Sequence, residues 1–293
     1  MQKKKTALLV TLMLCFFSLS QADAFQVTVS ILPLKYFVEK IAGERVEVSV
    51  MVKPGASPAT YEPTPRQMAR LSQSKIYFAV GVPFENVWLE KFAAARPSMH
   101  IVHTDENIVK IPLAAHSHAA EDHSDEHHPG IQDPHIWLSP PLVRILSETI
   151  RDALISIDPA HAYQYRKNYL MWAREISTCD SRIISLLQDR APGNNMFMVY
   201  HPSWGYFAKA YGLRQIPIEM EGKEPGPREF AEVLKLAKEK AIKVIFVQPQ
   251  FSERSAQTVA GEISGTLVKA DPLAYRWSEN LVAVAGAFTS ALR

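Results

Sequence analysis

Three side chains that bind transition metals lie in separate parts of the chain. His201 directly follows an apolar run that predicts a strand, Asp271 follows another such run, and His135 comes after a long polar stretch. Two imidazoles and a carboxylate suit zinc, manganese or ferrous iron, whereas calcium and magnesium prefer shells made of oxygen. Each residue alone has an ordinary structural explanation, such as a hydrogen bond or a turn. The prediction of a metal site therefore rests on the three residues together.

The elements that must position these residues follow a regular alternation. The region 27–103 predicts four short strands separated by helices, and the region 196–292 predicts four more strands with their helices. This alternation indicates parallel sheets covered by helices on both faces. Ligands bind to such sheets beyond the carboxyl ends of the strands, and this is where His201 and Asp271 fall.

Two helical stretches separate these regions. The second stretch, 159–188, has no internal glycine or proline and would span about 45 Å at 1.5 Å per residue. It is too long for an ordinary crossover helix, so we expect it to connect two lobes. The predicted fold class is α/β, with two Rossmann-like lobes joined by one long rigid helix and the metal site in the cleft between them. The expected boundaries are an N-terminal lobe at 25–157, the linker helix at 158–190 and a C-terminal lobe at 191–293.

The first 24 residues have the composition of an export signal. Lys3, Lys4 and Lys5 precede an apolar run at 7–19, and Ala22-Asp23-Ala24 supplies the small residues of a cleavage site. The apolar run is about a dozen residues long, whereas a helix needs about 20 to cross a bilayer. We therefore predict a signal peptide at 1–24 and a mature periplasmic protein with no stable membrane insertion.

Charge and cysteine content limit the possible partners and the possible disulfide bonds of this protein. The 32 basic and 30 acidic residues nearly balance, and the basic residues are spread out, which argues against a nucleic-acid partner. Cys179 is the only cysteine after the predicted signal, so the mature chain can form no internal disulfide. We expect Cys179 to be a small buried apolar residue.

A second signal for metal binding is compositional. Half of the ten histidines fall within one short acidic segment: His116, His118, His123, His127 and His128. Such a tract can hold several divalent ions weakly without a fixed structure, which suits the collection or sensing of metal. The alternative is a solvated loop whose histidines are accidental.

Several motifs, in order along the chain, carry a resemblance to a known family. They are Pro54-Gly55-Ala56-Ser57-Pro58, Tyr61-Glu62-Pro63-Thr64-Pro65, Asp133-Pro134-His135-Ile136-Trp137-Leu138, His201-Pro202-Ser203-Trp204-Gly205-Tyr206-Phe207, Glu221-Gly222-Lys223-Glu224-Pro225 and Asp271-Pro272-Leu273. From Phe25 onwards the chain resembles the metal-specific solute-binding proteins of ABC transporters, which serve zinc and manganese uptake. The resemblance implies two α/β lobes bridged by a rigid helix, with the metal between them. It also implies a monomer that partners a membrane permease and its cytoplasmic ATPase. Zinc-type members often carry a His- and acid-rich loop where residues 116–128 lie.

The resemblance carries over to individual residues with one departure. His135 and His201 occupy the second and third histidine-ligand positions, and Asp271 occupies the carboxylate position. The first histidine position holds Ala59, which cannot bind metal. Three replacements are open: a water molecule, which we favour, a loop histidine (His127 or His128), and Glu62. The alanine leaves zinc and manganese both open, although the histidine tract and the affinity of zinc for nitrogen ligands favour zinc.

Other function classes remain beside transport. A zinc hydrolase would need a general base, but the chain has no HExxH segment, and Gln248 stands where many family members have a glutamate. An adhesin or a periplasmic metallochaperone could share both fold and site. Binding requires neutral imidazoles, so we expect metal affinity to fall as the pH drops through about 6.5.

Overall fold

The structure is a computed structural model that describes residues 24–114, 131–219, 225–251 and 253–293. The predicted signal peptide at 1–24, apart from Ala24, lies outside the described residues. So do the five histidines of the acidic tract, and the prediction that they bind metal weakly stays a prediction.

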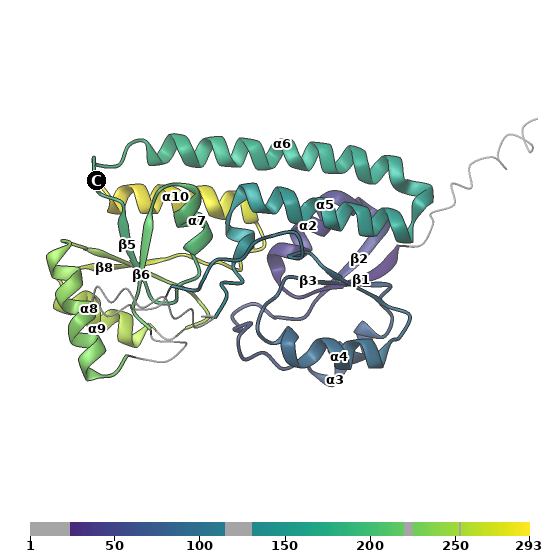
Figure 1. The fold of residues 1–293 in the computed structure, drawn as a ribbon, viewed down its shortest axis with the longest axis horizontal. Coiled ribbons are helices and arrows are strands. Elements are labelled where there is room, and N and C mark those ends of the chain that lie inside the picture. Colours follow the sequence, from purple (N-terminus) through teal and green to yellow (C-terminus); the bar gives the residue numbers. More distant parts are fainter. Residues whose placement is uncertain (1–23, 115–130, 220–224, 252) are drawn as a thin grey trace, which may run out of the picture.

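The N-terminal lobe is a four-stranded parallel sheet with the order β2-β1-β3-β4. Its helices cover both faces, with α2 and α5 on one side and α3 and α4 on the other (Figure 1). The elements are β1 (Phe25–Val29), α2 (Leu32–Ala42), β2 (Val46–Val50), α3 (Pro65–Leu71), β3 (Ile76–Ala79), α4 (Glu85–Ala95), β4 (His100–His103), the 3₁₀ turn η2 (Ile136–Leu138) and α5 (Pro140–Ile157).

The C-terminal lobe repeats this topology, because its parallel sheet has the order β6-β5-β7-β8. In both sheets the strand order reverses beside the first strand, and the carboxyl ends at such a switch point form a crevice for ligands. The elements are β5 (Met196–Val199), α7 (Gly205–Ala210), β6 (Arg214–Pro217), α8 (Pro227–Glu239), β7 (Val244–Val247), α9 (Arg254–Glu262), β8 (Thr266–Lys269) and α10 (Trp277–Ala291).

One long helix, α6 (Ala162–Leu187), runs over both lobes, as Figure 1 shows. It packs on α2 and α5 in the N-terminal lobe and on α10 in the C-terminal lobe. Its 26 residues span about 39 Å. The helix starts slightly later than the sequence predicts, because Pro159–His161 forms a separate 3₁₀ turn, η3. The predicted two-lobed α/β fold with a long helix is confirmed.

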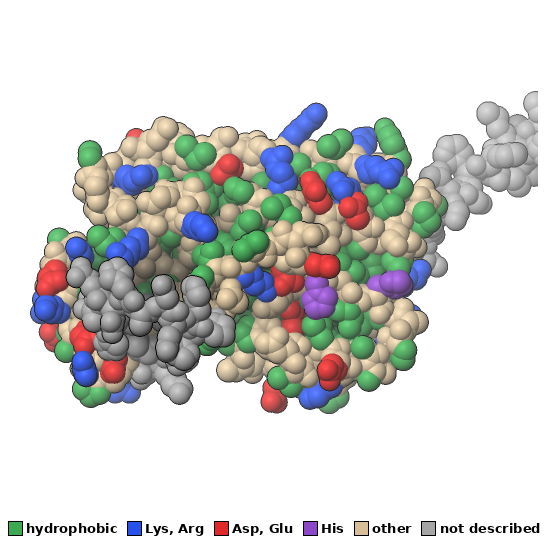
Figure 2. Space-filling view, in the orientation of Figure 1, with side chains coloured by type: hydrophobic (Ala, Val, Ile, Leu, Met, Phe, Trp, Pro, Cys, Tyr) green, Lys and Arg blue, Asp and Glu red, His purple; other side chains and the backbone are tan. Residues whose placement is uncertain are grey.

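The apolar interior continues from one lobe into the other beneath α6. Trp172 of α6 stacks on Phe37 of α2, with ring centroids 5.6 Å apart, and Trp277 of α10 lies edge-on to both rings at 5.4 and 5.5 Å. Cys179 is buried in the same interior, as predicted. A smaller apolar cluster fills the opposite face of the C-terminal sheet. The shared interior fixes the lobes against each other on the side of α6, while Figure 2 shows a notch between them at the opposite edge.

Two surface properties bear on the predicted partners. Acidic and basic side chains are interspersed on the face shown in Figure 2 rather than separated into patches of one sign. Among the helices of the described residues, none combines the length and the apolar character needed to cross a bilayer.

Candidate metal centre

His201 lies at the carboxyl end of β5 and is held from three sides. Its Nδ1 atom is 2.6 Å from Oε1 of Glu219, a buried carboxylate just beyond β6. The Gln248 side chain, just beyond β7, fixes the His201 main chain by accepting from its N–H at 3.3 Å and donating to its carbonyl at 2.6 Å. The Phe251 ring stacks on the imidazole with centroids 4.8 Å apart. These contacts leave the Nε2 edge of the ring for a ligand.

His135 has the same kind of support from the other side of the cleft. It precedes the 3₁₀ turn η2, and its Nδ1 lies 2.7 Å from Oδ1 of Asp133. The same oxygen accepts the His135 backbone N–H at 2.9 Å, and Asp133 is fully buried. Trp137 packs beside the imidazole with centroids 5.2 Å apart.

The two imidazoles meet, with ring centroids 5.3 Å apart, although they are 66 residues apart in the chain. In each ring the carboxylate at Nδ1 favours the tautomer whose Nε2 carries a free lone pair, which is the usual arrangement behind a metal-binding histidine. Burial lowers the pKa of His135 from its usual 6.5, against the opposing effect of Asp133. The ring is therefore neutral at pH 7, as metal binding requires.

Both rings line one cavity of about 470 Å³ between the lobes. Its walls come from the segments that follow the carboxyl ends of strands in both sheets, including Gly81 after β3 and Gln250 after β7. Ala59 also lines this cavity; it occupies the position at which the family that the sequence resembles has its first histidine ligand. The structure therefore places the histidine pair between the lobes, where the sequence predicts it.

Asp271 is the predicted ligand that the structure does not bring to the cavity wall. Its Oδ1 atom accepts from Nε2 of Gln250 and from the backbone N–H of Leu273, both at 2.9 Å. The next residue, Pro272, lines the cavity, whereas Asp271 is not among the lining residues. Within the described ranges no three His, Cys, Asp or Glu side chains are close enough together to hold a metal ion. Asp271 as a ligand stays a prediction.

Two carboxylates at the site have roles that the sequence prediction missed. The sequence marks Asp133 only as part of a motif, and Glu219 is not among the predicted site residues. Glu219 follows β6 in the way that His201 follows β5, so the rule that selected His201 could also have selected Glu219. Glu62, one of the replacements considered for the missing ligand, is exposed and is not among the residues that line the cavity.

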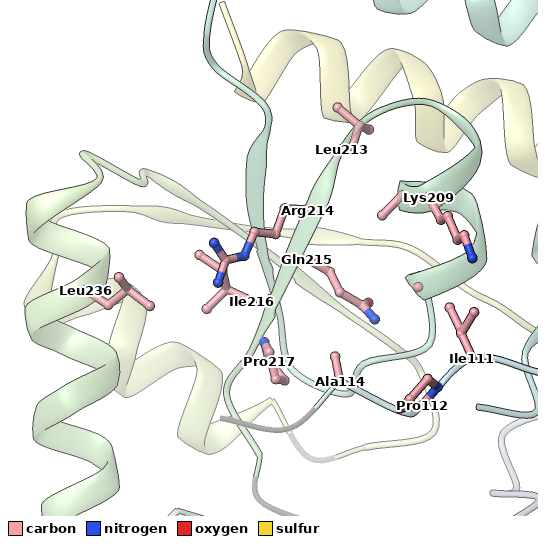
Figure 3. Close-up of a pocket in the computed structure, with 12 residues that line it drawn as sticks. Ile111, Pro112, Ala114, Lys209, Leu213, Arg214, Gln215, Ile216, Pro217 and Leu236 are labelled. Atoms are coloured by element: carbon pink, nitrogen blue, oxygen red, sulfur yellow. The ribbon is translucent and has the colours of Figure 1, made fainter. Parts of the chain in front are cut away.

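A second cavity, of about 460 Å³, lies beside the edge strand β6. Figure 3 shows Lys209 of α7 and Arg214 of β6 on its walls, with Leu236 of α8 on the far side. Its charged lining residues among those described are both basic, and none of the described lining residues is a His, Cys, Asp or Glu.

Comparison with known proteins settles the family. The family model described as "ZnuA: Zinc-uptake complex component A periplasmic" matches residues 27–283. The chain belongs to the ZnuA family. A crystal structure of ZnuA shares 39% sequence identity and superposes with a TM-score of 0.84, covering 92% of this chain and all of the other.

Two other relatives of this ZnuA-family chain are also named as metal-binding proteins, one of them for iron. A putative metal-binding protein of Chlamydia muridarum is 29% identical over 264 residues, which cover 90% of each chain. The iron-binding protein YfeA of Yersinia pestis is 28% identical over 245 residues, which cover 82% of this chain and 75% of YfeA.

Family membership confirms the predicted class of function. The chain belongs to a family of periplasmic metal-binding proteins of ABC uptake systems. ZnuA-family proteins bind a transport substrate and are not enzymes, so the hydrolase alternative is excluded.

Proposed function

We propose that this protein captures Zn(II) in the cleft between its lobes and delivers it to the permease of an ABC importer. His135 and His201 bind the metal through their Nε2 atoms. Asp271 joins as the carboxylate ligand when its Oδ1 atom exchanges Gln250 for the metal. The mature protein acts as a periplasmic monomer after removal of residues 1–24.

The single observation that supports this proposal most strongly is the pair of carboxylate-backed imidazoles. Asp133 and Glu219 each lie within 2.7 Å of the Nδ1 atom of one histidine, and the two rings are 5.3 Å apart. Hydrogen bonds from Nδ1 to carboxylates make an imidazole a stronger and better-oriented ligand. Two such rings that meet in one cavity suit a transition metal, and zinc exceeds manganese and iron in affinity for nitrogen.

Manganese or iron is the second candidate. The alanine at position 59 removes one nitrogen ligand and so reduces the preference for zinc, and the relative YfeA is named for iron. Anomalous diffraction above and below the zinc edge, on protein purified without added metal, identifies the bound ion directly.

Replacement of both histidines tests the ligands. We expect the His135→Ala, His201→Ala double variant to bind zinc at least 100-fold more weakly than the parent in a competition titration with a chromophoric chelator. The matched control replaces His100 and His103, two exposed histidines on β4, and should bind as the parent does. Parent-like affinity in the site variant would overturn the proposal.

Transport is tested in cells. A strain that lacks this protein should grow poorly when zinc is depleted, and the parent chain, but not the double variant, should restore growth. Restoration by the double variant would contradict the role of the two histidines, and normal growth of the deletion strain would favour an adhesin or metallochaperone role. Because α6 and the shared interior connect the lobes, we expect metal binding to produce small tilts and loop ordering rather than wide closure.

A further inference from the structure

The cavity at His135 and His201 is larger than an ion requires. A metal ion with six water molecules occupies roughly 180 Å³, because each water takes about 30 Å³. The cavity measures about 470 Å³. This volume falls in the range of about 300–1,000 Å³ that small organic ligands occupy.

The described walls of this cavity also supply few metal ligands. Among the described residues that line the cavity, the only strong ligands are His135, His201 and Glu219. Glu219 is engaged by His201, and Ala59 offers a methyl group. Even with Asp271, the described residues supply three donors, whereas zinc in a closed site takes four. At least one coordination position is left for a further ligand.

The cavity walls suit an organic ligand better than a cluster of water. Much of the surface is apolar, formed by side chains such as Val82, Leu113, Trp137 and Leu273. Water needs two to four polar partners at each position, which an apolar wall does not offer. An organic side chain could cover this surface favourably.

Two polar groups on opposite walls indicate which chemical groups the ligand carries. Lys110 lines the N-terminal wall, where its ammonium contacts Asp105 at 2.5 Å and retains further N–H donors for a carboxylate. Gln250 lines the C-terminal wall, and its Oε1 atom is buried without a hydrogen-bond partner among the described residues. An acceptor in this state is available to an N–H donor such as an amine.

We propose that the site binds its metal as a mixed complex with one small α-amino acid. The inference rests on the proposed function and specifies its substrate. The amine and carboxylate of the amino acid fill the open positions on the metal, next to His135 and His201. The second carboxylate oxygen accepts from Lys110, the amine donates to Gln250, and the amino-acid side chain covers the apolar wall. The missing ligand at Ala59 is thereby supplied by the cargo.

A titration at buffered free zinc tests this coupling. Metal-free mature protein is titrated with Zn(II) at defined free concentrations, with no addition, with L-histidine, or with N-acetyl-L-histidine, whose amine is blocked. We expect L-histidine to lower the half-saturating free zinc concentration at least tenfold and the blocked compound to have no effect. Native mass spectrometry should detect one zinc and one histidine on the protein.

Two variants with a matched control locate the effect. Ala59→His supplies a third imidazole, so zinc alone should bind more tightly and the L-histidine effect should shrink to within twofold. Lys110→Met should reduce the L-histidine effect at least fivefold, and a circular-dichroism spectrum like that of the parent reports that the variant is folded. Lys209→Met, in the separate cavity beside β6, should behave as the parent.

The outcomes separate this inference from the proposed function. The mixed complex is wrong if the half-saturating free zinc concentration is the same with and without L-histidine and native mass spectrometry detects zinc but no histidine on the protein. That outcome leaves zinc capture standing. Absence of zinc binding both with and without the amino acid overturns zinc capture itself.

Discussion

The indole N–H of Trp137 donates to the carbonyl of Pro272 across the cleft at 2.7 Å. The Trp277 indole in turn donates to the Trp137 carbonyl at 2.6 Å. Trp137 also packs on His135, and Pro272 follows Asp271. One buried hydrogen bond therefore connects the segments that carry two proposed ligands.

Replacing Trp137 with phenylalanine should destabilise the protein and weaken zinc binding. The change leaves the buried Pro272 carbonyl without its donor, which typically costs about 1–3 kcal/mol. Trp204→Phe is the matched control, because the Trp204 indole is equally buried and its N–H has no hydrogen-bond partner in the described part of the chain. We expect urea denaturation to give a larger loss for Trp137→Phe, and only that variant to bind zinc more weakly. Equal losses would contradict a role for the hydrogen bond.

The carboxylate behind His201 should control metal affinity. Glu219→Gln replaces the carboxylate at Nδ1 by a neutral amide, so the imidazole becomes a weaker ligand, and such changes typically reduce affinity 10–100-fold. A zinc titration measures the effect, with Glu262→Gln on the exposed face of α9 as the control. If both variants bind as the parent does, Glu219 only supports the fold.

Asp271 can be tested without disturbing its neighbours. In Asp271→Asn the remaining side-chain oxygen still accepts from Gln250 and Leu273, while the negative charge of the proposed ligand is lost. We expect zinc affinity to fall at least tenfold and the unfolding free energy to change by less than about 1 kcal/mol. Unchanged affinity would mean that the metal is held by the histidine pair and non-protein ligands.

Glu85 should make stability depend on pH. Its carboxyl group is buried at the start of α4, where it accepts from Ser30 and from the backbone N–H groups of Val80, Gly81 and Val82. Burial outweighs these bonds and raises its pKa from 4.5 to about 7. Between these values the folded state binds more protons than the unfolded state, so stability falls as the pH rises from about 4.5 to 7.

The contribution of Glu85 over this interval is about 3 kcal/mol, at 1.36 kcal/mol per pH unit. Urea denaturation between pH 4.5 and 8 measures it. Glu85→Gln cannot ionise, so its stability should lack this decline. A parallel decline in both proteins would assign the effect to other groups.

The sequence predicts the lobes and the histidine pair because both follow from local patterns. Alternating strands and helices specify parallel sheets, and residues just beyond the strands gather at one edge. His201 is such a residue, and its meeting with His135 follows once two lobes face each other. The state of Asp271 has no local signature, because it depends on a contact with Gln250 from a different loop. The sequence also does not separate the turn η3 from α6, since Pro159 fits both a helix and a 3₁₀ turn.

The aromatic interior shared by Phe37, Trp172 and Trp277 determines whether a fragment of this protein can fold on its own. Two of these rings come from helices that belong to different lobes, and the third comes from the helix that joins them. A fragment that contained one lobe alone would present a wide apolar face to water and aggregate. The two halves therefore need each other during synthesis and should fold as a single cooperative unit, despite their matching strand orders.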